Sequence, residues 1–431
     1  MSDLLRLATA GSVDDGKSTL VGRLLYDTKS VLADQIDAVT RASVDKGLST
    51  PDLSLLVDGL RAEREQGITI DVAYRYFATP KRSFVLADTP GHVQYTRNTV
   101  SGASTAQLVI LLVDARKGVI EQTRRHAAVL ALLGVPRLVL AVNKIDLVEN
   151  PAEVFAEISA EFGTLTAKLG WAESDVLEIP VSALHGDNIA SRSENTPYYD
   201  GPSLIEHLES VPVDADSTGA HALGLRFPVQ YVIRPRTAEY PDYRGYAGQI
   251  AAGSVSPGDE IVVLPSGKRT TVERVDTPDG ELAVAQVGRS VTLLLADEVD
   301  ISRGDIIASP ADAPEPIDTF DATVCWLGDK ALRPGARLLL KHGTKTTQAI
   351  VGALVERFDE QTLTAQESPE SLELNDIGRV SLRLAEPIPA DDYRTNRHTG
   401  SFLLIDPAGG NTLAAGLVGD VLTAVEVGAA V

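Results

Sequence analysis

The sequence predicts an α/β domain with a mostly parallel sheet and helices on both faces, followed by two small antiparallel β-barrel domains. In the first half, short apolar runs alternate with helix-like stretches, which is typical of a covered parallel sheet. The helix pattern nearly disappears after a polar stretch at Val211–Ala222. The 431 residues suffice for two to four domains of ~100–200 residues each, and we place them at residues 1–215, 216–313 and 314–431.

In the first domain, strand-like runs and helix-like stretches follow one another in order. The expected strands are Leu4–Ala10, Phe84–Asp88, Leu108–Asp114, Leu138–Lys144 and Val176–Ser182. The expected helices are Lys17–Tyr26, Glu121–Leu133, Ala152–Leu169 and Leu204–Glu209. Short apolar runs separated by helices predict parallel strands with crossover connections.

The second half contains short β-rich runs with Gly and Pro turns between them. The first group comprises Phe227–Ile233, Ala247–Ala251, Glu260–Leu264, Arg269–Val275 and Ser290–Leu295. The stretch Asp312–Pro316 is the expected boundary after it. The second group comprises Ala322–Leu327, Ala336–Lys341, Lys345–Val355, Ile377–Ala385 and Ser401–Ile405. This spacing predicts barrels, although patterning alone also permits sandwiches.

Composition excludes several classes of protein. Asp and Glu number 60 against 39 Lys and Arg, a formal charge of −21, which opposes nonspecific binding to nucleic acid and to anionic membranes. Cys325 is the only cysteine, so no intrachain disulfide can form, which fits a reducing compartment. No apolar run approaches the ~18 residues of a membrane span, and Met1-Ser2-Asp3 does not begin a signal peptide. We therefore expect a cytoplasmic protein with no membrane or nucleic-acid partner.

A phosphate-binding loop follows the first expected strand and opens the first expected helix. It fits G-x-x-x-x-G-K-[ST] and consists, with the next residue, of Gly11, Ser12, Val13, Asp14, Asp15, Gly16, Lys17, Ser18 and Thr19. Backbone N–H groups in such a loop converge on phosphate oxygens, Lys17 reaches the β- and γ-phosphates, and Ser18 ligates Mg²⁺. The alternative is an ordinary glycine-containing turn.

Asp88, Thr89, Pro90 and Gly91 end another apolar strand and are followed by His92. Asp88 is suited to hold Mg²⁺ through water, and the Gly91 N–H is suited to meet the γ-phosphate. His92 is the candidate for positioning the attacking water. D-T-P-G is also good turn chemistry, so its position behind a phosphate loop decides the interpretation. The other six histidines lack such a context: we expect His126 on a helix and His185, His207, His221, His342 and His398 in loops or on the surface.

Two later motifs predict guanine recognition. Asn143, Lys144 and Asp146 form N-K-x-D at the end of a buried strand, and the Asp146 carboxylate can accept both guanine N1–H and N2–H₂. Ser182, Ala183 and Leu184 end the next strand, where the Ala183 N–H can donate to guanine O6. A further threonine, Thr69 in Gly67–Ile70, has the hydroxyl for a second Mg²⁺ contact in a switch loop. Without that context Thr69 would be a plain strand residue.

These motifs in this order, followed by two β domains, resemble the translation-factor class of GTPases, whose D-T-P-G-H form includes the water-positioning histidine. A sharper resemblance, carried by residues 12–19, 22–28, 63–77, 94–98, 114–118 and 399–406, is to the large, GTP-hydrolysing subunit of bacterial sulfate adenylyltransferase. One departure is the stretch His92-Val93-Gln94, where relatives often carry a glutamate after the histidine.

The resemblance implies GTP and Mg²⁺ as cofactors and a role in sulfate assimilation. The family couples GTP hydrolysis to ATP + sulfate → adenosine 5′-phosphosulfate + diphosphate, and a smaller subunit carries out the adenylyl transfer in a heterodimer or higher assembly. No S-G-G-x-D-S pyrophosphate loop occurs in this chain. The main alternative is an elongation-factor-like GTPase that delivers RNA to the ribosome, which the charge disfavours. A stand-alone regulatory GTPase is the third.

Overall fold

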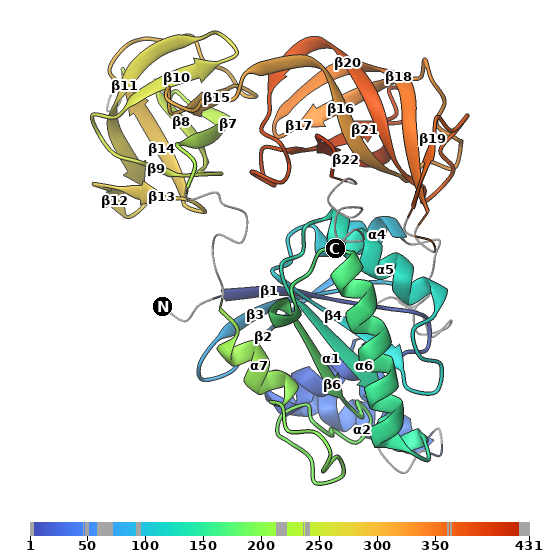
Figure 1. Ribbon diagram of the computed structural model, residues 1–431. Helices are drawn as coiled ribbons and strands as arrows, with labels where there is room; N and C mark the ends of the chain where they lie inside the picture. The colour runs from blue at the N-terminus through green and yellow to red at the C-terminus, as the bar shows by residue number, and fades with distance from the viewer. Residues whose placement is uncertain are drawn as a thin grey trace. The chain divides into compact units, whose positions relative to one another are not determined.

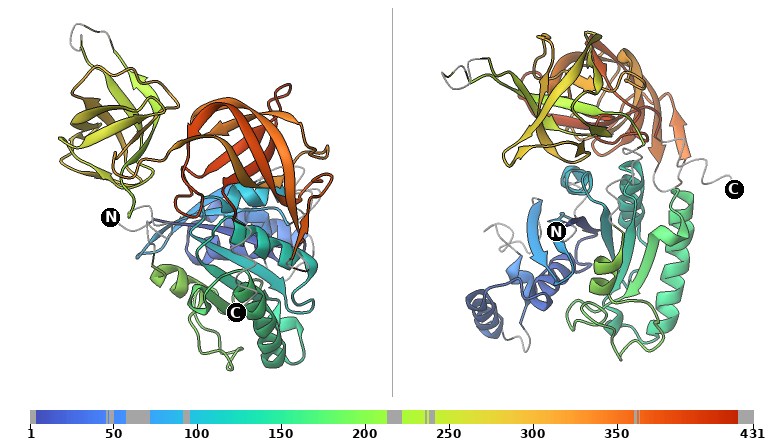
Figure 2. Two further views of the ribbon diagram at one scale, coloured as in Figure 1. Left: turned by 45° about the horizontal axis from the view of Figure 1, so that its top comes forward. Right: turned by 90° about the vertical axis from the view of Figure 1, so that its left-hand side faces the viewer.

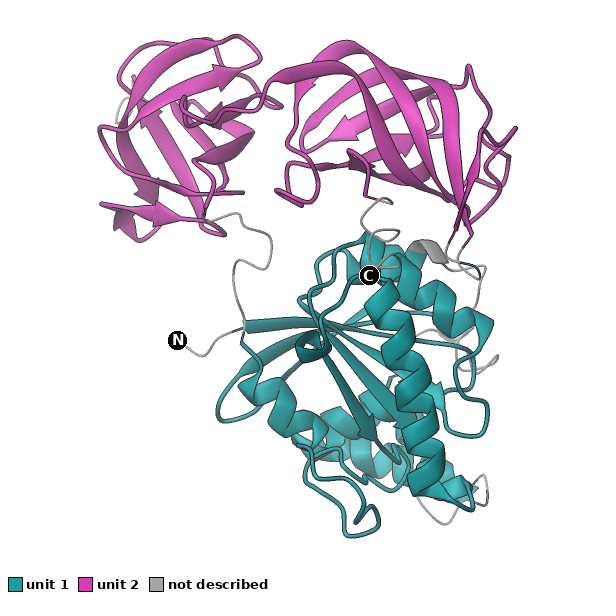
Figure 3. Ribbon diagram, in the orientation of Figure 1, with its two compact units in different colours: residues 1–213, 360–363, 423–431 teal, residues 214–359, 364–422 magenta. Residues whose placement is uncertain are grey.

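The computed structural model describes residues 4–45, 47, 51–57, 72–91, 96–212, 222–235, 237, 242–359, 362 and 364–421. The chain divides into two compact units (Figure 3), which are residues 1–213 with 360–363 and 423–431, and residues 214–359 with 364–422. Among the helices within these ranges, none combines the length and apolarity that a membrane crossing requires.

A six-stranded sheet forms the centre of the first unit. Its strands are β1 (Leu4–Gly11), β2 (Ala73–Ala78), β3 (Ser83–Asp88), β4 (Leu108–Asp114), β5 (Leu138–Asn143) and β6 (Val176–Pro180), in the spatial order β2-β3-β1-β4-β5-β6 (Figure 1). All neighbours are parallel except β2, which runs antiparallel to β3 at the edge. The mostly parallel sheet predicted from the sequence is confirmed.

Helices lie on both faces of this sheet (Figures 1 and 2). The α-helices are α1 (Lys17–Asp27), α2 (Ala33–Asp45), α4 (Thr96–Ala103), α5 (Glu121–Leu132), α6 (Pro151–Lys168) and α7 (Leu204–Ser210), and short 3₁₀ turns occur at Leu53–Leu56, Ile145–Leu147 and Glu173–Asp175. Strand β2 and helices α2 and α4 are additions to the elements expected from the sequence. α7 begins with a capping box in which Ser203 and Glu206 exchange side-chain-to-backbone hydrogen bonds.

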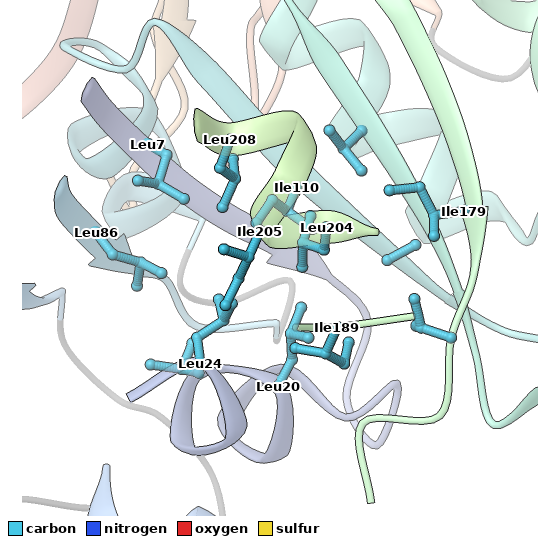
Figure 4. Close-up of a cluster of buried hydrophobic side chains, with 14 of the residues drawn as sticks. Leu7, Leu20, Leu24, Leu86, Ile110, Ile179, Ile189, Leu204, Ile205 and Leu208 are labelled. Atoms are coloured by element: carbon cyan, nitrogen blue, oxygen red, sulfur yellow. The ribbon is translucent and has the colours of Figure 1, made fainter. Parts of the chain in front are cut away.

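The core of this unit explains why the strands read as continuous apolar runs. Every residue of β4 is buried. Since side chains alternate along a strand, Leu108, Ile110 and Leu112 face one side, where they join a cluster with Leu20 and Leu24 of α1 and Leu204 and Leu208 of α7 (Figure 4). The intervening residues of β4 face the other side, and α5 packs against β1 and β4.

The second unit contains two closed antiparallel barrels of six strands each. In the first, β7 (Arg226–Ile233), β8 (Gly245–Gln249), β10 (Glu260–Leu264), β11 (Lys268–Thr277), β14 (Ser290–Leu295) and β15 (Ile306–Ala308) close through the β10–β11 pairing, and β9 (Ser254–Val255), β12 (Gly280–Glu281) and β13 (Ala285–Gln286) are short additions.

The second barrel is formed by β16 (Pro316–Trp326), β17 (Arg337–His342), β18 (Lys345–Asp359), β20 (Ile377–Pro389), β21 (Ser401–Ile405) and β22 (Thr412–Val418). It closes through β17–β18, with β19 (Thr364–Glu367) beside β18. The predicted barrels are confirmed, while the predicted domain boundaries stay a prediction.

A buried ion pair links the two barrels. Arg226 on β7 is 1% exposed. Its Nε lies 3.1 Å from Asp391 Oδ2, its Nη1 lies 3.3 Å from Asp312 Oδ1, and Thr399 donates its hydroxyl to Asp391. Removal of one partner from such a group leaves an uncompensated charge, which is costly.

Candidate nucleotide-binding site

The predicted site residues gather at the carboxyl ends of the central strands. Gly11 ends β1, Asp88 ends β3, Asp114 ends β4 and Asn143 ends β5. The pairing register sets Asp88 opposite Thr9 of β1, and Asp114 opposite Asn143. Ligands of open parallel sheets bind at this edge, so motifs that are far apart in the sequence become neighbours.

The phosphate loop is closed around Lys17. The ammonium Nζ donates to the carbonyls of Gly11 and Ser12, both at 2.8 Å, and the side chain is buried. Burial lowers the pKa of Lys17, and the charges of Asp88, Asp15 and Asp14 oppose that shift. Gly16 is the N-cap of α1, with φ of 97°, a backbone conformation that favours glycine. The positive end of α1 therefore opens directly behind the loop.

Two glycines leave no space for a side chain. A Cβ on Gly91 would lie 2.2 Å from Lys17 Nζ and 2.5 Å from the Gly11 carbonyl oxygen. A Cβ on Gly16 would lie 2.3 Å from Asn143 Nδ2. The D-T-P-G segment therefore packs directly against the phosphate loop. Backbone that approaches this closely is suited to cradle phosphate oxygens.

Asp88 lies at the inner end of the site and is 0% exposed. Thr9 donates its hydroxyl to Asp88 Oδ1 at 2.9 Å, and Thr89 donates to the Thr9 carbonyl at 2.6 Å. These bonds fix the Asp88 carboxylate in the vicinity of Lys17. Of the other predicted residues here, Pro90 is buried, whereas Ser12, Val13, Ser18 and Thr19 are partly exposed and Asp14 is exposed.

Asn143 connects the phosphate loop with the later Ser-Ala-Leu segment. Its Nδ2 donates to the Asp15 carbonyl at 2.7 Å, and its Oδ1 accepts the Ala183 N–H at 3.0 Å, both buried. The Ala183 N–H that was predicted to donate to guanine O6 thus already has a partner, which O6 would share or replace. Ser182 is buried, and its hydroxyl accepts the His185 N–H at 3.3 Å.

Asp146 follows the end of β5; the residue is exposed as a whole, and its side chain is 22% exposed. Its Oδ2 lies 3.7 Å from Nε2 of His185, whose side chain is 53% exposed. Leu184 is 47% exposed. Lys144 has a left-handed φ of 61°, and its Nζ donates to the Asp14 carbonyl and to Asp114 Oδ2, so the N-K-x-D segment is bonded directly to the phosphate loop.

Sequence reasoning did not assign a role to Asp114, which bridges two cations. Its side chain is fully buried, and it accepts hydrogen bonds from Arg116 and Lys144 at 2.6–3.0 Å. Burial alone would raise the pKa of Asp114, but these two partners outweigh it and hold the pKa well below its usual range. Its position at the end of an apolar strand was the available signal.

His126 is the second residue that the sequence analysis passed over. It lies on α5, is 2% exposed, and its imidazole is hydrogen-bonded to the Gly11 backbone. Gln122 Nε2 lies 3.0 Å from His126 Nε2. Burial, together with the nearby charges of Lys17 and Arg125, lowers the pKa of His126 to about 3, and the hydrogen bond to the Gly11 backbone only partly opposes this shift. A neutral histidine therefore supports the carbonyl that also holds Lys17.

One other histidine differs from its prediction. His342 lies in β17 rather than in a loop and is buried, with Nε2 2.7 Å from the Thr399 carbonyl oxygen. A lone histidine carries no periodic signal that reports burial. His207 lies on α7, within the helix expected at Leu204–Glu209, and is partly exposed.

Thr69 and His92 lie outside the described residues, so their predicted roles stay predictions. Among the predicted Mg²⁺ ligands, Ser18 and Asp88 are described. Within the described ranges, no three His, Cys, Asp or Glu side chains come together as a ready-made cation site.

Comparisons with known proteins agree with this geometry. Residues 2–221 match the family of the elongation factor Tu GTP binding domain, and residues 319–419 match the GTP-eEF1A C-terminal domain-like family. The chain is 55% identical to the bifunctional enzyme CysN/CysC of Mycobacterium tuberculosis, over 97% of this chain and 67% of that protein.

Two relatives align over most of both chains. Sulfate adenylyltransferase subunit 1 of Saccharophagus degradans is 48% identical over 97% of this chain and 88% of its own length. The corresponding subunit of Methylorubrum populi is 50% identical over 98% and 88%.

The parallel sheet, the phosphate loop and the family match define the first domain as a GTP-binding domain of the translation-factor class of P-loop GTPases. Within that class, the chain belongs to the sulfate adenylyltransferase subunit 1 family.

Proposed function

We propose that this chain is the GTP-hydrolysing subunit of a sulfate adenylyltransferase. In this proposal a smaller partner subunit converts ATP and sulfate to adenosine 5′-phosphosulfate and diphosphate, and GTP cleavage drives that unfavourable transfer. The observation that carries the proposal is the 48% identity with the Saccharophagus degradans subunit 1 over 97% of this chain. That relative is named as one subunit of an enzyme, which supports a second protein subunit as the partner of this chain.

The proposal assigns Mg²⁺ to the phosphate end of the site. The Ser18 hydroxyl at the first turn of α1 would ligate the ion directly, and Asp88 would hold it through water. The fit rests on chemistry that the residues possess: hard oxygen donors, an Asp88 side chain with no solvent exposure, and a fixed hydrogen bond from Thr9. Mg²⁺ would offset the negative charge of the phosphates when bound.

The residues of the chain divide the remaining work. Lys17 would keep part of its hydrogen bonding with the loop carbonyls and would donate its other hydrogen bonds to the β- and γ-phosphates. Gly91, packed against Lys17, would place its N–H at the γ-phosphate. His92 would orient the attacking water, and Thr69 would add a second Mg²⁺ contact when its loop orders. Asp146, whose side chain is partly exposed, would select guanine.

The elongation-factor alternative requires a surface that attracts RNA. The chain carries a formal charge of −21, which repels a polyanion. A cytoplasmic location is part of the proposal, since the substrates ATP and GTP are cytoplasmic metabolites.

The test compares product yield with and without cleavable GTP. GTP turnover is measured for this chain alone, with its partner subunit, and with partner plus ATP and sulfate. Turnover is expected to rise at each step, and adenosine 5′-phosphosulfate is expected to exceed its GTP-free equilibrium level only when GTP can be hydrolysed. The control is Lys17→Ala, which should abolish the gain.

Equal yields with a non-hydrolysable GTP analogue would show that hydrolysis does not drive the transfer. Coupling at the level of binding is reciprocal, so GTP should tighten ATP or sulfate binding by the factor by which they tighten GTP binding. Calorimetric titration in both orders checks that equality.

A further inference from the structure

A single arginine connects the helix behind the phosphate loop with the segment expected to recognise guanine. Arg23 lies on α1, six positions after Lys17, which is about 9 Å along a helix axis at ~1.5 Å per residue. Its Nε donates to the Ala183 carbonyl at 3.2 Å, and its Nη2 donates to the Leu184 carbonyl at 2.5 Å. These carbonyls are 160 and 161 residues away in the sequence.

The third nitrogen of Arg23 is also engaged. Nη1 lies 3.6 Å from Asp27 Oδ1 one turn later on α1, and the guanidinium carbon lies 5.7 Å from the centre of the Tyr26 ring. The Arg23 side chain is 17% exposed. All three nitrogens of the planar fork therefore have separate partners, an arrangement that lysine cannot reproduce.

Ala183 is consequently held on both sides. Asn143 Oδ1 accepts its N–H at 3.0 Å, and Arg23 binds its carbonyl at 3.2 Å. Because a trans peptide is planar, fixing the Ala183 and Leu184 carbonyls also fixes the directions of the N–H groups of Leu184 and His185. The second of these already donates to Ser182 Oγ.

Gly186 completes the enclosure of the guanidinium. Its φ is +87°, and a Cβ built there would come 3.5 Å from Arg23 Nη1. The turn therefore passes close to Arg23 in a conformation that glycine adopts readily. The segment 182–186 is thus shaped by contacts from α1 and from the end of β5 as well as by its own turn.

We infer that Arg23 is a positioning residue for guanine recognition, which sets the backbone of Ala183 and Leu184 against O6 of the base. The inference rests on the proposed use of the site for guanine nucleotides. Arg23 touches no nucleotide in this role. It acts through the peptide groups that it holds.

Base analogues separate this role from a general structural one. GDP, 6-thio-GDP and inosine diphosphate are titrated into the full chain carrying Arg23→Met and into the wild type. 6-Thio-GDP keeps the N1–H and N2–H₂ groups but replaces O6 by a weakly accepting sulfur. Inosine diphosphate keeps O6 and N1–H but lacks the 2-amino group that Asp146 would bind.

Arg23→Met should weaken GDP binding about tenfold and 6-thio-GDP binding about twofold, a difference of the size expected for one misplaced hydrogen bond. The preference for GDP over inosine diphosphate should stay unchanged. Arg23→Lys, which can keep one of the carbonyl contacts, should give an intermediate loss. Arg41→Met on the exposed face of α2 is the matched control, with wild-type constants expected.

Equal losses for all three nucleotides, or none, would overturn the inference, since a role in stability alone predicts no dependence on O6. If Arg23→Met does not fold, as judged by circular dichroism, Arg23→Lys decides by the same ratios. Equal binding of GDP and ADP by the wild type would instead refute guanine selectivity itself, and both proposals would fall.

Discussion

Replacement of His126 by glutamine should reduce the loss of unfolding free energy that the first unit shows as the pH falls below neutral. In the folded chain, burial lowers the pKa of His126 from 6.5 to about 3. The unfolded chain therefore takes up a proton as the pH falls below 6.5, while the folded chain does not. Above pH 6.5, His126 is neutral in both states and does not affect the free energy of unfolding. Between pH 6.5 and about 3, the free energy of unfolding falls progressively, because only the unfolded chain binds the proton.

The magnitude follows from the size of the shift. Each pH unit within this window is worth about 1.4 kcal/mol, so wild-type stability should fall, through this one group, by about 1 kcal/mol between pH 7 and 5.5 and by about 3 kcal/mol at pH 4. Glutamine has no proton to gain, and its amide can still donate to the Gly11 carbonyl. His126→Gln should therefore lack this part of the pH dependence.

The assay is urea unfolding of wild type and His126→Gln at pH 7 and 5.5, above the sequence pI of about 4.7, with free energies compared between the two proteins at each pH. An NMR titration of labelled histidines gives the pKa directly, with the variant identifying the His126 resonance. A ring that titrates near 6.5, or equal slopes for both proteins, would refute the buried, neutral state of His126.

Three further predictions concern other parts of the chain. Asp146→Asn should lower GDP affinity by about 1–3 kcal/mol and improve xanthosine diphosphate binding, as measured by calorimetry; undiminished GDP affinity would contradict the assignment. His92→Ala should keep GTP affinity within about twofold yet slow hydrolysis in the complete complex, because water positioning acts in the transition state; full turnover would show that another group orients the water. Arg226→Met should destabilise the two barrels by about 3–5 kcal/mol by stranding the buried Asp391 carboxylate, and an unchanged unfolding midpoint would argue against this.

The positions of the phosphate loop and of the N-K-x-D segment at the ends of strands were predictable from sequence because each motif is local. A loop such as Gly11–Ser18 carries its own glycines, lysine and hydroxyl within eight consecutive residues, and the apolar run before it already predicts the strand that ends at the site. The same applies to Asn143–Asp146 after β5. The short strands with regular turns predicted two β domains, but they permitted sandwiches as well as barrels. Closure into barrels through β10–β11 and β17–β18 depends on pairings between strands.

What only the tertiary structure decided is how these motifs are supported. Arg23 lies in α1, Asp114 at the end of β4 and His126 in α5. The periodicity of these elements predicts which residues are buried or exposed, but not which partners they bind. Arg23 is hydrogen-bonded to Ala183, 160 residues away, and Asp114 to Lys144, 30 residues away. His126 is hydrogen-bonded to the backbone of Gly11. Sequence patterns report the period of a backbone and the chemistry of adjacent side chains. The direction of a buried carbonyl or the desolvation of an imidazole is created only when distant segments pack together, which is why these residues became visible only in the folded chain.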